Sequence, residues 1–213
     1  MLSTFIIMTS EYHLVHAVLG SNPGLVLKIL KDGYLYSGFE TGNSALFGSP
    51  TAKYIYFSLL NEDITFKHAV TFIINGQILY DRPFRYSLGW FTEDLDMNIE
   101  AKHQDINKIL QKIANHIKLV SDDELKRSMS HEILIRKQVN LHKYLVAICC
   151  SQLLTPNIIN YVKQYYPRVK ILDKFPETSQ ELNRIFYNTP SSYKSKYHKY
   201  KRKYLHLKDN FPK

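Results

Sequence analysis

The apolar residues of this chain occur in short runs, and the runs follow the periods of strands and of helices in mixed order. Phe5–Val18 and Lys53–Leu60 are rich in β-branched and aromatic side chains and predict strands. Leu25–Lys31 and Ile99–Val120 carry apolar residues at helical spacing and predict helices, the first of which ends at Gly33. No run reaches the roughly 18–20 residues of a membrane span, so no membrane partner is expected. Short strands mixed with short helices predict an α+β domain.

The remaining segments predict further short elements. Asn75-Gly76 lies between two apolar runs and predicts a β-hairpin over Val70–Tyr80. Asp81–Thr92 is aromatic and predicted to be irregular, whereas Leu141–Leu154 is apolar and fits either a strand or a helix. Four more elements are predicted: a strand over Glu132–Ile135, a helix from Thr155 to about Tyr165, a strand over Pro167–Leu172 and helical turns over Ser179–Tyr187.

The net charge of +9 is concentrated at the end of the chain. Residues 191–213 hold eight Lys and Arg against the single acid Asp209, so residues 1–190 carry only about +2. We therefore expect a domain over 1–190 and a basic tail over 191–213. The tail places aromatic and apolar residues at heptad spacing, namely Tyr193, Tyr197, Tyr200, Tyr204, Leu207 and Phe211. This pattern fits self-association or docking, nucleic-acid contact, an address or packaging tag, or a merely solvated helix.

The two cysteines, Cys149 and Cys150, are adjacent and too few for a zinc cage, so no metal is expected. They predict buried thiols in a reducing compartment. The start of the chain is apolar but has no basic region, and it predicts a first strand better than a signal peptide. The oligomeric state is left open.

Three segments stand out together because of their order. The first is Leu14-Val15-His16-Ala17, followed by Asn22 and a helix that ends in Ile29-Leu30-Lys31-Asp32-Gly33. The second is Tyr54-Ile55-Tyr56-Phe57-Ser58. The third is Glu132-Ile133-Leu134-Ile135, followed by Gln138-Val139-Asn140-Leu141-His142-Lys143-Tyr144-Leu145.

In this order the segments resemble the catalytic domain of the ADP-ribosyltransferase superfamily, in its poly(ADP-ribose) polymerase or diphtheria-toxin-like branch. The resemblance spans about residues 10–150 and implies split antiparallel β-sheets with short flanking helices, here followed by a basic C-terminal helix. It also implies NAD as substrate. The Lys/Tyr-rich tail resembles those of many giant DNA virus proteins, which implies a cytoplasmic or nuclear location in an infected cell, or a place in the virion.

The resemblance assigns roles to individual residues. Glu132 is the predicted catalytic carboxylate, because cleavage of the nicotinamide–ribose bond develops positive charge on the ribose, as in glycoside hydrolysis. His16 is expected to hold the adenosine-side ribose, Tyr56 to stack on nicotinamide and the Ala17 backbone to clamp its amide. The predicted NAD-binding set is completed by three further residues, Asn22, Ser58 and Phe66.

Two of these positions depart from the family. Ala17 stands where glycine is usual, and Phe66 is the nearest aromatic residue to the place of a second tyrosine. Taken singly, His16, Tyr56 and Glu132 also fit structural roles as a core histidine, a packing ring and a strand-edge charge.

The function expected from the resemblance is mono-ADP-ribosyl transfer from NAD to a protein or nucleic-acid acceptor. Two alternatives stay open: an inactive interaction module that keeps the fold and binds a virion or host factor, and an RNA 2′-phosphotransferase. The second needs several arginines on a phosphate, for which Arg82 and Arg85 are the candidates. The same two arginines are also candidates for the NAD pyrophosphate, or for solvated positions in a surface turn.

Overall fold

The computed structural model describes residues 12–18, 23–41, 52–60, 70–87, 106–119, 132–149, 153–176 and 178–187. The chain divides into two compact units, Met1–Ser179 and Gln180–Lys213. The predicted tail over 191–213 lies outside the described residues. In chain order the elements are β1 His13–Val18, α1 Pro23–Asp32, β2 Tyr34–Tyr36, β3 Tyr54–Leu59, β4 Val70–Asn75, α2 Ile78–Asp81, β5 Phe84–Ser87, α3 Ile106–Leu119, β6 Glu132–Arg136, β7 Gln138–Asn140, α5 Leu141–Tyr144, β8 Leu145–Cys149, α6 Pro156–Tyr165, β9 Lys170–Leu172 and α7 Ser179–Tyr187.

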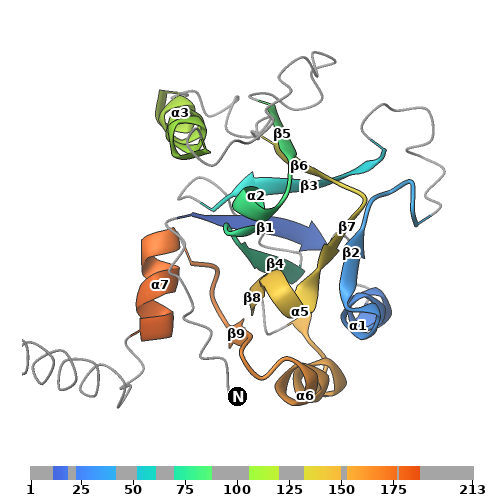
Figure 1. Ribbon diagram of the computed structural model, residues 1–213. Helices are drawn as coiled ribbons and strands as arrows, with labels where there is room; N and C mark the ends of the chain where they lie inside the picture. The colour runs from blue at the N-terminus through green and yellow to red at the C-terminus, as the bar shows by residue number, and fades with distance from the viewer. Residues whose placement is uncertain are drawn as a thin grey trace, which may run out of the picture. The chain divides into compact units, whose positions relative to one another are not determined.

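The first unit is built on a seven-stranded sheet in the order β5-β6-β3-β1-β4-β8-β9. Figure 1 shows these strands stacked from β5 at the top to β9 at the bottom. All neighbouring pairs are antiparallel except β8–β9. The central strands β1 and β4 supply fully buried side chains, among them Leu14, Phe72 and Ile74. The α+β class predicted from the sequence is confirmed.

A second, two-stranded sheet pairs β2 with β7. The chain passes from the large sheet to the small one at Lys137, which separates β6 from β7 and has a φ of 71°. Lys137 is tied to both sides, since its N–H donates to the Lys53 carbonyl and its own carbonyl accepts from Ser37 N–H. The division into a large, mainly antiparallel sheet and a small antiparallel one matches the split predicted from the sequence.

Local signals explain where the helices begin and end. Helix α1 stops at Gly33, whose φ of 73° lies in the left-handed region and whose N–H donates to the Ile29 carbonyl. Helix α6 begins after Thr155, whose hydroxyl accepts from Ile158 N–H, and it carries Pro156 at its first position. None of the described helices is both long enough and apolar enough to cross a membrane.

The predicted hairpin over Val70–Tyr80 is wrong. The strand ends at Asn75 and is followed by the short helix α2 rather than by a second strand. A type I′ turn needs positive φ at both central residues, and neither Asn75 nor Gly76 has it. Instead the Asn75 side-chain oxygen accepts from Gln77 N–H, and this local bond turns the chain into the helix.

Two other segments differ from expectation. The prediction that Asp81–Thr92 is irregular is wrong in part, because the segment contains strand β5, which pairs with β6 through four register positions. Leu141–Leu154, which fits either a strand or a helix in sequence, contains one of each, because the helix α5 passes directly into strand β8. Asn140 caps α5 by accepting from Lys143 N–H, and this polar cap gives the apolar stretch its helical start.

Candidate active site

The large sheet opens at the middle of β1. Strand β1 pairs with β4 at six register positions along its whole length, but with β3 at only two, Leu14 with Leu59 and Val15 with Ser58. Beyond Val15 the ladder between β1 and β3 stops, although both strands continue. We call this point the β1–β3 fork. His16 is the first residue past the fork on β1.

The His16 imidazole bonds to the backbone of β3 at the fork. Its Nδ1 lies 2.8 Å from the carbonyl oxygen of Tyr56, and its ring centroid is 5.5 Å from that of Phe57. A carbonyl can only accept, so Nδ1 carries the hydrogen. Burial lowers the pKa of His16 below 6.5, and the hydrogen bond to Tyr56 raises it to a smaller extent. The ring is therefore neutral at pH 7, and Nε2 is left as an acceptor.

Glu132 belongs to the next strand, β6. It opposes Ser87 on β5, and its neighbour Ile133 opposes Phe57 on β3. The predicted residues His16, Tyr56 and Glu132 thus come from three adjacent strands, β1, β3 and β6. Paired strands lie about 4.8 Å apart, so the backbones of β1 and β6 are separated by about 10 Å at the last rung before the fork. The Glu132 side chain lies outside what the structure describes, and its catalytic role stays a prediction.

His16 and Tyr56 approach the fork from different sides of the sheet. His16 lies on the face that carries Phe57 and Phe72. Its ring contacts that of Phe57, and it opposes Phe72 on β4. Side chains alternate along a strand, so Tyr56 projects to the other face, where its register partner is Leu134. Tyr56 is half-buried. The phenol ring and the imidazole therefore flank the fork rather than lie against each other.

The other predicted NAD-binding residues have separate outcomes. Ala17 opposes Thr71 on β4 and is half-buried, one residue past His16. Ser58 is buried and opposes Val15 at the last rung before the fork. Asn22 and Phe66 lie outside the described residues. The roles of all four toward NAD stay predictions.

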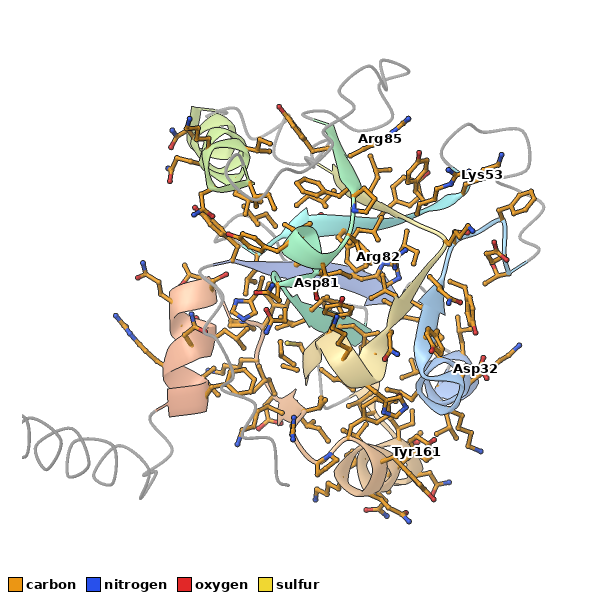
Figure 2. The ribbon with its side chains drawn as sticks, viewed as in Figure 1. Asp32, Lys53, Asp81, Arg82, Arg85 and Tyr161 are labelled. Carbon is orange, nitrogen blue, oxygen red and sulfur yellow. The ribbon has the colours of Figure 1, made fainter. Side chains whose placement is uncertain are left out.

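Arg82 is used inside the fold. Its guanidinium donates to the carbonyl oxygens of Arg136, at 2.8 Å, and of Gln138, which flank Lys137. Figure 2 labels Arg82 beside Asp81, at the end of α2. The arginine is partly buried and holds the passage from β6 to β7. Two of its N–H groups are therefore used inside the fold, and no local sequence signal indicates bonds to residues more than fifty positions away.

Asp81 links α2 to α5 through a cluster that the sequence did not indicate. Its carboxylate accepts from the Tyr144 hydroxyl at 2.9 Å and lies 2.8 Å from the Lys143 ammonium. Desolvation opposes the change, but hydrogen bonds from Lys143, Tyr144 and Gln77 lower the pKa of Asp81 overall. The cluster joins the end of α5 to the end of α2. Across the described part of the chain, no group of three or more His, Cys, Asp or Glu side chains is arranged to hold a metal ion.

Comparisons with known proteins place the chain among viral relatives. The family described as "Family of unknown function (DUF5846)" matches residues 9–122, more than half of the chain. Uncharacterized protein L54 of Acanthamoeba polyphaga mimivirus is 37% identical over 180 residues, which cover 83% of this chain and 98% of L54. Uncharacterized protein L28 of the same virus is 38% identical over 101 residues, 46% of this chain and 97% of L28.

Among solved structures, the fold is similar to the ADP-ribosyltransferase fold of DarT from Thermus sp. 2.9. The structure of DarT in complex with carba-NAD+ matches with a TM-score of 0.50 at 10% identity, over 80% of this chain and 98% of DarT. The structure in complex with ADP-ribosylated ssDNA matches with a TM-score of 0.50 at 11% identity, over 79% and 96%. At this identity the likeness concerns the fold alone, and it confirms the predicted fold class.

Proposed function

The chain belongs to the DUF5846 family, and we propose that it transfers ADP-ribose from NAD to a protein or nucleic-acid acceptor. The observation that carries the proposal is the hydrogen bond of His16 to the Tyr56 carbonyl at the β1–β3 fork. It fixes a neutral imidazole with an accepting Nε2 at the point where the sheet opens. The likeness of the fold to DarT, whose structures include complexes with carba-NAD+ and with ADP-ribosylated ssDNA, supports the same function.

The chemistry is set by the residue types at the fork. Nε2 of His16 accepts a hydrogen bond from a ribose hydroxyl, and Tyr56 offers a half-buried ring to nicotinamide. In the transfer, a lone pair of the acceptor forms a bond to the ribose C1′. The bond from C1′ to the nicotinamide nitrogen breaks, its electron pair stays on nicotinamide, and the acceptor's proton passes to Glu132 or to solvent. The Glu132 carboxylate stabilises the positive charge that develops on the ribose.

Arg82 helps to choose between activities of related folds. A 2′-phosphotransferase would need arginines on a phosphate, and Arg82 is already bonded to two backbone carbonyls. Arg85 lies over the Tyr54 ring, with its guanidinium carbon 5.4 Å from the ring centroid. Because Arg82 is engaged by the backbone, the two candidate arginines do not form a phosphate-binding pair, and we favour ADP-ribosyl transfer over phosphate removal. The mimivirus relatives support action in an infected cell.

The test is incubation of the full chain with NAD labelled in its adenylate phosphate, together with mixed protein and nucleic-acid acceptors. Glu132→Gln keeps the size of the side chain and removes its charge, and we expect it to lower labelling about a hundredfold or more. Glu181→Gln, an exposed substitution on α7, is the matched control and should label like the wild type. Equal labelling by the wild type and Glu132→Gln would contradict the catalytic assignment.

Thermal unfolding with and without NAD separates the enzyme from the interaction module. An enzyme of this kind binds NAD in its folded state, so NAD raises the unfolding temperature in a concentration-dependent manner. The Glu132→Gln variant should retain this rise, because His16 and Tyr56 are unchanged. A chain that neither labels an acceptor nor shifts its unfolding temperature with NAD would be an interaction module.

A further inference from the structure

Strand β2 has one open edge in the described part of the chain. The small sheet consists there of β2 and β7 alone, which pair through three register positions. Figure 1 shows β2 to the right of β7, with no described strand beyond it. The edge of β2 that faces away from β7 is therefore a place where a further strand can add.

The hydrogen bonds to β7 decide which backbone groups reach this edge. Leu141 N–H donates to the Gly33 carbonyl, and Ser37 N–H donates to the Lys137 carbonyl, each at 2.8 Å. Residues that bond to the neighbouring strand alternate with residues that do not along an antiparallel pair. The odd-numbered residues of this stretch therefore direct their backbone groups at β7, and the even-numbered residues direct theirs away from it.

Tyr34 and Tyr36 carry the outward-directed groups. Their backbone N–H and carbonyl groups have no hydrogen-bond partner among the described residues. The other edge of the small sheet differs, because the outward carbonyl of Gln138 on β7 accepts from the Arg82 guanidinium. Four backbone groups on β2 are thus left for a strand from outside.

The side chains around the edge are also of the kind that contacts a protein. β2 consists of Tyr34-Leu35-Tyr36, without the charged residues or prolines that usually protect an open edge. In the part of the chain that the structure describes, five large hydrophobic side chains are exposed. Three of them, Leu25, Tyr36 and Phe39, belong to the segment that contains α1 and β2. Exposed apolar side chains beside an open edge favour a protein partner.

We propose that β2 pairs with β2 of a second copy of this chain, antiparallel and about a two-fold axis at Leu35. In this register Tyr34 of each copy opposes Tyr36 of the other. Each opposed pair exchanges two N–H to carbonyl hydrogen bonds, so four bonds form and every outward-directed group of both strands is used. The result is one sheet of four strands, with β7 of each copy at its outer sides.

The second copy is favoured over an unrelated peptide because β2 complements itself. Its two outward-directed residues lie on either side of Leu35, so a two-fold axis there brings each onto the other. Within one copy, the Tyr34 and Tyr36 ring centroids are 6.0 Å apart. Directly opposed residues of an antiparallel pair have Cβ atoms about 4.5–5.5 Å apart. The four rings of the two copies therefore form one continuous aromatic face over the joined strands.

The first test is sedimentation equilibrium of the full chain from about 5 to about 500 μM. Two paired strands of three residues bury less than the about 1,200 Å² of a stable interface, so we expect a weak dimer that forms as the concentration rises. Tyr36→Lys keeps the backbone N–H but puts a charge on the edge. Tyr165→Lys, which replaces a half-exposed tyrosine on α6, is the matched control.

We expect Tyr36→Lys to lower the association constant about tenfold or more, because the two-fold axis doubles the effect of the lost ring pair. The Tyr165→Lys variant should associate like the wild type. Circular dichroism checks that both variants fold. The tail is the same in all of these chains, so dimerisation through the tail would not distinguish them.

The second test is disulfide cross-linking of Tyr34→Cys chains with Tyr36→Cys chains under mild oxidation. Opposed bonded residues have Cα atoms about 5.5 Å apart, within the range that a disulfide spans. Two copies of the same variant would place their new cysteines about 8 Å apart, which is too far. We therefore expect a covalent dimer from the mixture and little from either variant alone. The wild type measures cross-linking through its own cysteines.

Three results would overturn the proposal. A wild-type chain that stays monomeric up to about 500 μM would leave the β2 edge to an unrelated peptide. Equal association of the Tyr36→Lys and Tyr165→Lys variants would place the contact on another surface. Equal cross-linking of the mixture and of either cysteine variant alone would exclude the antiparallel register. None of these results bears on ADP-ribosyl transfer, which the labelled-NAD assay tests separately.

Discussion

Arg82→Met tests the view that one arginine holds the passage from β6, the strand of Glu132, to β7. Methionine keeps much of the aliphatic side chain but loses the bonds to the carbonyls of Arg136 and Gln138. A hydrogen bond from a charged donor contributes about 1.5–3 kcal/mol. Because Arg136 and Gln138 are exposed, water replaces part of each bond, and about 1 kcal/mol per bond remains. The expected loss is about 2 kcal/mol of unfolding free energy, or a decrease of about 4–8 °C in Tm.

The assay is urea and thermal unfolding followed by circular dichroism, together with the labelled-NAD assay. Arg82→Lys should lose about half as much stability, because one ammonium cannot serve both carbonyls with the geometry of a guanidinium. Arg168→Met, at an exposed turn after α6, is the control and should stay within about 0.5 kcal/mol of the wild type. If Arg82→Met unfolds like Arg168→Met, the two bonds do not hold the β6–β7 passage, and the reasoning is refuted.

Three further predictions concern backbone conformation and pH. Gly33→Ala should lower the free energy of unfolding in urea by about 1–3 kcal/mol, since φ is 73° and the new Cβ would lie 3.0 Å from the His142 ring. Adding His142→Ala should recover only the part of this loss that comes from the clash with the ring. Lys137→Gly should instead stabilise by up to about 1 kcal/mol, because φ is 71° there; a loss in the same assay would contradict this sign. Burial lowers the pKa of His13 from 6.5 to about 4, so the unfolded chain takes up the proton first and stability falls as pH drops below 6.5. Between pH 7 and pH 5 the loss is about 2 kcal/mol, and it should be largely absent in His13→Asn; an equally steep pH dependence in that variant would exclude His13 as the cause.

Elements with strong local signals were predictable from the sequence. Gly33 ends α1 and Thr155-Pro156 begins α6, as expected, because a left-handed glycine and a hydroxyl cap act within one turn of the chain. The hairpin at Asn75-Gly76 failed for the opposite reason. The same dipeptide serves either a type I′ turn or a side-chain bond to the next backbone N–H groups, and tertiary packing of the neighbouring segment decides between them.

The sequence predicts the candidate site only as a set of residues, whose roles stay predictions, and it does not predict their geometry. The order of the three motifs placed His16, Tyr56 and Glu132 together, and the structure puts them on adjacent strands. The fork depends on where the β1–β3 ladder stops, which no local pattern encodes. The Arg82 bonds also join distant residues.

A crystal structure of the full chain with carba-NAD tests the central claim most directly, because this analogue resists cleavage of the nicotinamide bond. Its nicotinamide end should lie at the β1–β3 fork, with the ring against Tyr56 and a ribose hydroxyl about 3 Å from Nε2 of His16. Glu132 should face the ribose that carries the nicotinamide. A nucleotide bound elsewhere on the chain, with the fork closed by side chains, would contradict the account.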